Sequence, residues 1–266
     1  MLTTPEQRES FKQDGFLIIR GLFSSEEIAG LKADVARLNT EQLVEEADGR
    51  CRSGMVVEDK DTPRLQFDIH KTGTRFDLLA RHPRTVGIVQ EVMGAPFYLY
   101  HSKFAFKAAF TGSVNFWHQD YGYWVNNRHP EPMMASCFVM IDPHTEDNGC
   151  MQVLARSHNE GVVAHEPSPR ESTGDGQIRI PASEMAKHCR KYTRIKLLGR
   201  PGDFVVWHCN TMHASADNIS ENSRHTAILA YNAVGNYDRS QPLEDNPYGA
   251  VRDTPVEQCA DNALIV

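Results

Sequence analysis

The sequence FYLYHSKFAFKAAF, residues 97–110, decides the fold class because it is the first of several short stretches with β-strand character. Similar runs rich in β-branched and aromatic residues follow it, separated by breakers such as Thr111-Gly112, Asn148-Gly149 and Pro201-Gly202. Short strands at this spacing are typical of a β-sandwich or barrel, so the sequence predicts a mainly β fold. The strands are predicted at residues 97–110, 135–141, 151–154, 194–198, 204–208 and 226–231.

The chain before residue 96 has a different pattern, in which apolar residues recur at helical spacing. A polar, glycine-bearing stretch at residues 42–65 interrupts this pattern and is predicted to be a loop. We therefore expect one domain with a helical N-terminal part at about 1–95, a β-barrel core at about 96–235 and a C-terminal tail at 236–266. The expected N-terminal elements are a helix from Pro5 closed by Gly15, a strand at 16–19, a helix behind a capping box from Ser24 to Glu27, and a helix at 83–93 closed by Gly94.

Composition narrows the classes of function. The net charge is −7 and there is no long basic run, which does not favour a nucleic-acid or anionic-membrane surface. The six cysteines include no Cys-x-x-Cys pair, no apolar stretch is long enough to span a membrane, and residues 1–9 contain no apolar signal core. We expect a reduced, cytoplasmic protein with a small-molecule partner, and the sequence leaves both a monomer and a homodimer open.

Two residues in the stretch WHQD at positions 117–120, His118 and Asp120, form the first part of a candidate metal site. In a strand, residues two apart point to the same face, so one nitrogen and one carboxylate oxygen reach a shared point. His213 follows a Gly-Asp turn and an apolar strand and completes a set of two histidines and one carboxylate. This is the facial triad of non-haem Fe(II) oxygenases, although zinc accepts the same ligands. His208 is the alternative third ligand, but strand phase favours His213.

Arg224, eleven residues after His213, is a candidate anion-binding residue. A guanidinium binds a carboxylate through two parallel hydrogen bonds and stays charged at any relevant pH. This property suits the distal carboxylate of 2-oxoglutarate. The alternative interpretation of Arg224 is a surface salt bridge.

Taken together and in this order, the motifs resemble the phytanoyl-CoA dioxygenase family. The resemblance covers about residues 8–232, and the stretches 103–107 and 117–124 look closest to its ectoine and proline hydroxylase branches. The motifs that carry it are His118-Gln119-Asp120, Asn148-Gly149-Cys150-Met151, Ser157-His158, Gly202-Asp203 and His213-x-Ser215 followed by Asn218-x-Ser220 and Arg224.

The resemblance implies a double-stranded β-helix (a jelly roll, or cupin-like barrel) with flanking α-helices. It implies Fe(II) held by His118, Asp120 and His213, and 2-oxoglutarate bound through Arg224 and Ser215. The implied reaction uses O2 to oxidise 2-oxoglutarate to succinate and CO2 while an unactivated C–H bond is hydroxylated. Two inward positions differ from the ectoine hydroxylases, which have asparagine and glutamine where this chain has Ala105 and His101, so ectoine itself is not expected to be the substrate.

Further side chains are expected around the same site. His101, Lys103, Ala105 and Lys107 alternate on one strand and share a face, which is either the barrel interior or the solvent side. If it is the interior, Lys103 or Lys107 pairs with 2-oxoglutarate or with an anionic group of the substrate. Phe138 packs against 2-oxoglutarate or is plain core. His101 and Lys107 are expected substrate contacts. Further expected substrate contacts, for which ordinary packing is the alternative, are Tyr121, Tyr123, Trp124, Asn126 and Arg128.

The expected function is hydroxylation of a small polar or zwitterionic metabolite, such as an amino acid, a compatible solute or an aminophosphonate-like compound. One alternative is a tailoring oxygenase that acts on a secondary metabolite or an acyl thioester, which a large apolar cleft would favour. Another is a non-catalytic β-barrel that binds a metal or a small ligand. The polar insertion at residues 159–192 is either a lid over the site or a plain surface loop.

Overall fold

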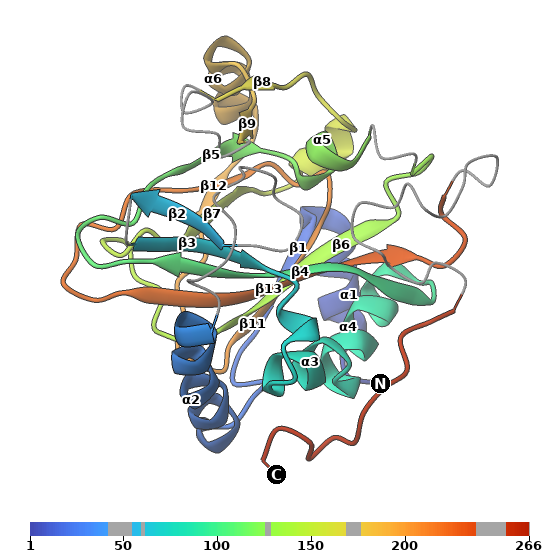
Figure 1. Cartoon of the computed structure of the whole chain (residues 1–266). Coiled ribbons are helices and arrows are strands. Elements are labelled where there is room, and N and C mark those ends of the chain that lie inside the picture. The colour runs from blue at the N-terminus through green and yellow to red at the C-terminus, as the bar shows by residue number, and fades with distance from the viewer. Residues whose placement is uncertain (42–54, 60–61, 126–128, 169–176, 238–253, 266) are drawn as a thin grey trace.

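Two antiparallel β-sheets face each other and form the centre of the fold (Figure 1). The computed structural model describes residues 1–41, 55–59, 62–125, 129–168, 177–237 and 254–265. The larger sheet has the strand order β1 (Phe16–Ile19), β11 (Phe204–His208), β6 (Met134–Met140), β13 (Arg224–Ala233), β4 (Phe97–Lys107), β3 (Thr62–Phe67) and β2 (Met55–Asp59). The smaller sheet has the order β10 (Arg194–Lys196), β7 (Met151–Leu154), β12 (His213–Ser215) and β5 (Asn115–His118). This architecture is the jelly roll with flanking helices that the resemblance implied.

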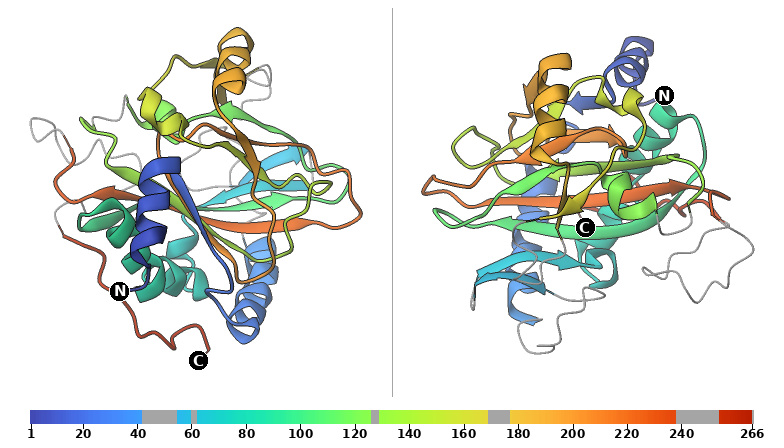
Figure 2. Two further views of the ribbon diagram at one scale, coloured as in Figure 1. Left: turned by 180° about the vertical axis from the view of Figure 1, so that it is seen from behind. Right: turned by 90° about the horizontal axis from the view of Figure 1, so that it is seen from above.

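Four helices cover the outer face of the larger sheet (Figures 1 and 2). They are α1 (Pro5–Asp14), α2 (Ser25–Glu41), α3 (Arg75–Ala80) and α4 (Pro83–Met93). Their buried residues, among them Phe11, Leu31 and Phe76, join Phe104 and Leu229 of the sheet in one apolar cluster. Burial of such side chains is the main stabilising term for the packing of helices on a sheet. The inner face of the sheet is thereby left for the site. None of the helices in the described ranges is long and apolar enough to cross a membrane.

The predicted helix ends are confirmed in detail. Thr4 accepts a hydrogen bond from the backbone of Gln7 while the Gln7 side chain accepts from the backbone of Thr4, which is a capping box at the start of α1. Ser24 and Glu27 form the same reciprocal pair before α2. Gly15 closes α1 at a φ of 81°, a left-handed conformation that glycine adopts without steric cost.

The predicted loop at residues 42–65 is corrected where the structure describes it, and residues 42–54 and 60–61 lie outside the described residues. Residues 55–59 and 62–67 form strands β2 and β3, which add to the edge of the larger sheet beside β4. The sequence TPRLQF of β3 does not indicate this role, because proline is unusual in a strand that is paired on both sides, as β3 is by β2 and β4. The N-terminal part therefore contributes three strands as well as helices. The short helix α3 was also not predicted.

The polar insertion at residues 159–192 contains regular structure. It includes the small sheet of β8 (Glu166–Pro167) and β9 (Ile178–Arg179) and the helix α6 (Ala182–Lys191). The helix lies beyond the smaller sheet at the top of Figure 1. The backbone N–H of Ile180 donates to the carbonyl of Trp117 on β5, so the returning chain is fastened to the smaller sheet.

Candidate metal centre

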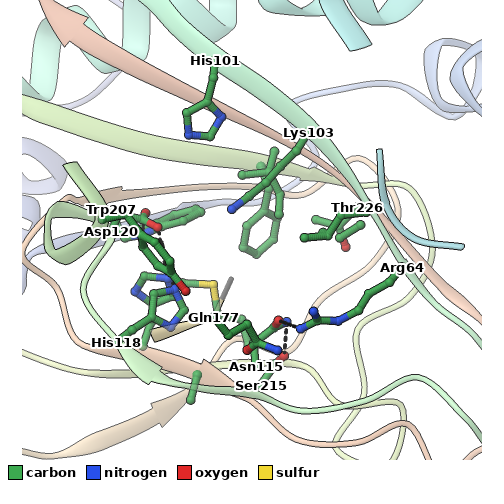
Figure 3. A pocket seen from close by; sticks show the side chains of 18 of the residues that line it. Arg64, His101, Lys103, Asn115, His118, Asp120, Gln177, Trp207, Ser215 and Thr226 are labelled. Atoms are coloured by element: carbon green, nitrogen blue, oxygen red, sulfur yellow. Dashed lines mark hydrogen bonds and ion pairs between the residues drawn. The ribbon is translucent and has the colours of Figure 1, made fainter. Parts of the chain in front are cut away.

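A cavity of about 250 Å³ lies between the inner faces of the two sheets (Figure 3). This volume is close to the lower end of small-molecule sites in proteins. The polar and charged side chains that line it are Arg64, His101, Lys103, Asn115, His118, Asp120, Gln177, Ser215, Arg224 and Thr226. Asp120 is the only carboxylate among the described residues of the lining.

His118, Asp120 and His213 meet at one end of this cavity. His118 is the last residue of β5 and is directly opposite His213, the first residue of β12, in the antiparallel ladder. The alternation argument assumes that Asp120 continues the strand of His118, but in the structure it does not. It is the first residue of the short helix α5 (Asp120–Trp124), and the turn after β5 brings its carboxylate to the histidines. The Oδ1 atom of Asp120 lies 3.9 Å from Nε2 of His118 and 3.7 Å from Nε2 of His213.

Backbone carbonyls orient both histidines. Nδ1 of His118 lies 2.6 Å from the carbonyl oxygen of Phe116, and Nδ1 of His213 lies 2.9 Å from that of Thr211. A carbonyl oxygen can only accept, so each Nδ1 carries the proton and each Nε2 keeps its lone pair. Burial lowers the pKa of His118 to about 3, which keeps that ring neutral. Both imidazoles therefore present a metal-binding nitrogen to the centre of the cluster.

Hydrogen bonds also fix the orientation of the Asp120 carboxylate. Its Oδ2 atom accepts hydrogen bonds from Oγ of Ser136 at 2.6 Å and Nε1 of Trp207 at 3.0 Å, so Oδ1 is the atom left to face the histidines. Burial alone would raise the pKa of Asp120. Interactions with His213 and Lys103 outweigh it, and the pKa falls to about 2. The residue is therefore an anion at neutral pH, as a metal ligand must be.

These atoms fit a metal ion. The ligand atoms of the three residues all lie within 4.8 Å of one another, and no second cluster of this kind occurs in the described part of the chain. Ligands about 2.1 Å from an ion and at right angles are roughly 3 Å apart, so small side-chain rotations would close the site around the ion. Two neutral imidazoles and one carboxylate leave open positions on the opposite face of an octahedral ion. His208, the alternative ligand, lies outside this cluster, with its ring 5.6 Å from that of His158.

Arg224, the first residue of β13, provides a buried positive charge in the same cavity. It is 5% exposed, and its Nη1 donates to Oγ1 of Thr226 at 3.2 Å. Its Nε has no hydrogen-bond partner, and it forms no ion pair with any described residue. Burial lowers the pKa of Arg224 to about 10, which leaves it protonated at neutral pH. A buried donor without an acceptor is costly, so this position fits an anion rather than the surface salt bridge of the alternative interpretation.

The alternation on β4 places His101, Lys103 and Ala105 in the cavity, as expected for the interior face. Burial, with a smaller contribution from Arg64, lowers the pKa of Lys103. Lys107, the fourth residue of this row, does not line the cavity. Its ammonium donates to the carbonyl oxygens of Ser113 at 2.7 Å and Ala216 at 2.6 Å, which hold it at the end of the strand. The expected ligand contact of Lys107 is therefore not supported.

The aromatic residues divide in the same way. Phe138 lines the cavity and stacks on His144 with ring centres 5.3 Å apart, and Tyr123 and Trp124 line it from α5. Tyr121 points elsewhere, because its hydroxyl donates to the carbonyl of His129 at 2.7 Å and its ring is buried in a separate apolar cluster. Its predicted substrate contact is not supported either. Asn126 and Arg128, the remaining predicted contacts, lie outside the described residues.

Sequence reasoning missed four polar residues of the lining, namely Arg64, Asn115, Gln177 and Thr226. Nη2 of Arg64 donates to Oδ1 of Asn115 at 2.8 Å, and Nδ2 of Asn115 donates to Oγ of Ser215 at 3.0 Å (Figure 3). Asn115 lies three residues before His118, and its position next to the metal motif was a signal that could have indicated it. Arg64 and Gln177 belong to polar stretches without a periodic pattern, so no local signal indicated them.

Comparison with known proteins finds relatives that match most of this chain. An ectoine dioxygenase from Stutzerimonas stutzeri is 28% identical over 247 residues, which cover 90% of this chain and 80% of that protein. An ectoine dioxygenase from Nocardia farcinica is 28% identical over 87% of this chain and 78% of its own length.

Solved structures share the fold. The crystal structure of EctD from S. alaskensis with 2-oxoglutarate and 5-hydroxyectoine superposes with a TM-score of 0.78 at 23% identity, covering 97% of this chain and 87% of that one. The carbocyclase SnoK from nogalamycin biosynthesis reaches 0.66 at 18% identity, covering 87% and 85%. The family model described as phytanoyl-CoA dioxygenase matches residues 11–226, most of the chain. The chain therefore belongs to the phytanoyl-CoA dioxygenase family.

Proposed function

We propose that this protein is an Fe(II)- and 2-oxoglutarate-dependent dioxygenase that hydroxylates a small polar or zwitterionic metabolite. The observation that carries the proposal is the pairing, within one cavity, of a pre-oriented set of two histidines and one aspartate with the buried guanidinium of Arg224. Membership of the family and the ectoine dioxygenases among its relatives support the reaction class.

His118, Asp120 and His213 would hold the iron. The bound iron, with 2-oxoglutarate and O2, supplies the oxidation of an unactivated C–H bond while 2-oxoglutarate is converted to succinate and CO2. The chain contributes position and the exclusion of water around this chemistry. Phe116 and Thr211 fix the imidazoles through their carbonyl groups, and the buried walls shield the reacting centre.

Arg224 would bind the distal carboxylate of 2-oxoglutarate, with Ser215 as a second donor and Phe138 along the carbon chain. The unpartnered Nε and Nη2, which lie on the same side of the guanidinium, offer the two parallel donors that a carboxylate accepts, while Nη1 is engaged by Thr226. Lys103 projects into the space between this end and Asp120 and makes no hydrogen bond or ion pair with the described residues (Figure 3). Its ammonium would bind an acidic group of the cosubstrate or the substrate.

The lining favours a small substrate that carries an acidic group. Lys103 and Arg64 add positive charge to the cavity, and Asp120, the only described carboxylate there, is committed to the metal. The rings of Tyr123 and Trp124 offer faces for the cationic part of a zwitterion. An amino acid, a compatible solute or an aminophosphonate-like compound has these properties. A cavity of about 250 Å³ speaks against the large secondary metabolites and acyl thioesters of the alternative function.

The test begins without a substrate. Purified protein is mixed anaerobically with Fe(II) and titrated with 2-oxoglutarate, and the visible charge-transfer band of the chelated 2-oxo acid is recorded. O2 and a panel of small zwitterions are then added, and succinate is measured. We expect the band in the native protein and in His208→Ala, its loss in His118→Ala, and stimulation of succinate release by one class of zwitterion. A native protein with neither band nor succinate would favour the non-catalytic barrel and refute the proposal.

A further inference from the structure

Two consecutive hydrogen bonds link Arg64 on β3 to Ser215 on β12 across the wall of the cavity (Figure 3). All three residues line the cavity, and Asn115 of β5 is the one that connects the other two. Asn115 and Ser215 are opposite each other in the ladder between β5 and β12. The inference drawn from these two hydrogen bonds rests on the proposed function, in which Ser215 contacts 2-oxoglutarate.

A β-bulge gives Arg64 its direction. Leu65 and Phe67 both line the cavity, so strict alternation along β3 would send the side chain of Arg64 to the opposite face of the sheet. The register between β2 and β3 shifts at this point, because Leu65 is paired with Val56 but Pro63 with Val57, which leaves Arg64 as the extra residue. Bulges re-aim side chains, and here Arg64 becomes 5% exposed and points into the cavity.

The chemistry of Arg64 fixes which atom donates in each of the two hydrogen bonds. A guanidinium can only donate, so the atom of Asn115 that faces Arg64 is the carbonyl oxygen Oδ1. The amide nitrogen Nδ2 must then face Ser215 and donate to its hydroxyl oxygen. The hydroxyl of Ser215 makes no other hydrogen bond with the described residues, so its own hydrogen has no acceptor among them. Because Ser215 lines the cavity, that hydrogen is available to a ligand.

We propose that Arg64 and Asn115 are positioning residues that commit the hydroxyl hydrogen of Ser215 to the distal carboxylate of 2-oxoglutarate. Arg224 supplies charge at this end of the cavity, and Ser215 supplies a donor of fixed direction. Together they would select a 2-oxo acid with a second carboxylate over one without it. Asn115 is essential to this selection because it fills the acceptor side of Ser215, which prevents the hydroxyl from donating back to the protein.

The experiment measures binding rather than turnover. Fe(II)-loaded protein is titrated anaerobically with 2-oxoglutarate and with 2-oxobutyrate, which chelates iron in the same way but lacks the distal carboxylate. For Asn115→Leu we expect the Kd of 2-oxoglutarate to rise about tenfold, the value of one hydrogen bond to a charged group. The Kd of 2-oxobutyrate should not change. This second titration also serves as the folding control.

Two further variants sharpen the test. Asn115→Asp keeps an acceptor for Arg64 but would accept the Ser215 hydrogen itself, so it should weaken 2-oxoglutarate binding at least as much as Asn115→Leu. Ser215→Ala combined with Asn115→Leu should bind 2-oxoglutarate no worse than Ser215→Ala alone, because the two residues act through one hydrogen bond.

Each contrary outcome has a separate meaning. Additive losses in the Ser215 and Asn115 double variant, or an equal loss for 2-oxobutyrate, would overturn the positioning role while the proposed function stands. A native protein that gives no 2-oxoglutarate band would overturn the proposed function and the inference with it. The comparison of Ser215→Ala with the Ser215 and Asn115 double variant requires only 2-oxoglutarate. It therefore decides the question even where 2-oxobutyrate binds too weakly to be measured.

Discussion

The two ends of the cavity are built in different ways. At the metal end, His118 and His213 each hydrogen-bond to a carbonyl two residues earlier in the chain. At the cationic end, Arg64, Lys103 and Arg224 come from three different strands. The contacts there cross large distances in sequence, 51 residues from Arg64 to Asn115 and 100 residues from Asn115 to Ser215. The orientation of the two histidines at the metal end is therefore defined by short motifs, whereas the cationic end is defined by the register of the sheets.

This difference has an energetic side. A ligand oriented by its own neighbouring backbone needs little from the rest of the fold once its strand has formed. A guanidinium that reaches its partner across a sheet depends on bulges and strand pairing being correct, because a shift of one residue sends a side chain to the other face. The metal end should thus tolerate changes elsewhere better than the cationic end does. Four experiments can break or sharpen this contrast.

The largest effect is expected at Asp120. In Asp120→Asn the amide must place its oxygen toward the donors Ser136 and Trp207, which turns its NH2 group toward the metal position. An amide nitrogen that carries two hydrogens does not bind a metal ion, so Fe(II) affinity should fall by more than about a hundredfold. This loss exceeds the usual effect of removing a residue that only hydrogen-bonds to a metal ligand. Metal content after gel filtration measures this change. Asp142→Asn, which removes a carboxylate away from the cavity, is the control and should retain the metal.

Arg224 should give the next largest effect. Arg224→Ala removes the charged partner of the distal carboxylate, and the Kd of 2-oxoglutarate should rise about a hundredfold, within the ~2–5 kcal/mol measured for buried charge pairs. Arg224→Lys should recover only part of this loss, because an ammonium lacks the paired donors of a guanidinium. Anaerobic titration gives both values. Equal affinity in the native protein and Arg224→Ala would remove Arg224 from this role.

Gln119 tests whether the metal end is truly local. This fully buried side chain donates to the carbonyls of Gly161 and Asn210 and accepts from the backbone N–H of Val163, so it ties the metal-binding turn to two distant segments. Gln119→Glu cannot donate and would place a charge beside two carbonyl oxygens. Fe(II) affinity should fall about tenfold. Gln13→Glu, at an exposed position on α1, is the matched control. An unchanged affinity would confirm that the motif positions its ligands without help.

A pair of lysines on β4 gives the smallest change in activity. Lys103→Met removes an ammonium that has no hydrogen-bond partner in the described residues, so it should weaken binding of the cosubstrate or substrate about fivefold without loss of stability. Lys107→Met leaves the carbonyls of Ser113 and Ala216 without their donor. It should lower Tm by about 2–6 °C with unchanged binding. Succinate release and thermal unfolding of both variants distinguish the two roles, and a reversed pattern would contradict them.

The same contrast explains what the sequence could predict. The residues of the candidate metal centre, Arg224 and the helix caps each stand in a short motif, so spacing and family resemblance are sufficient to propose them. Lys107 and Tyr121 were assigned to the site from their position in a row or next to a motif. The contacts that hold them elsewhere, to Ala216 and His129, depend on tertiary structure. Arg64 cannot be found from the sequence, because its orientation depends on a bulge in β3, a strand whose proline and polar residues are typical of a loop.

Strand β1 has a consequence for shortened forms of the protein. All four of its residues pair with β11, with Phe16 opposite Trp207, and the carbonyl of Gly15 accepts from the backbone of His208 and the hydroxyl of Thr211. A form that began at Ser24 would leave an apolar strand edge bare, which invites association between molecules. It would also loosen the indole that steadies Asp120. The residues of β1, remote in sequence from all three proposed ligands, are therefore expected to be required for the proposed metal centre.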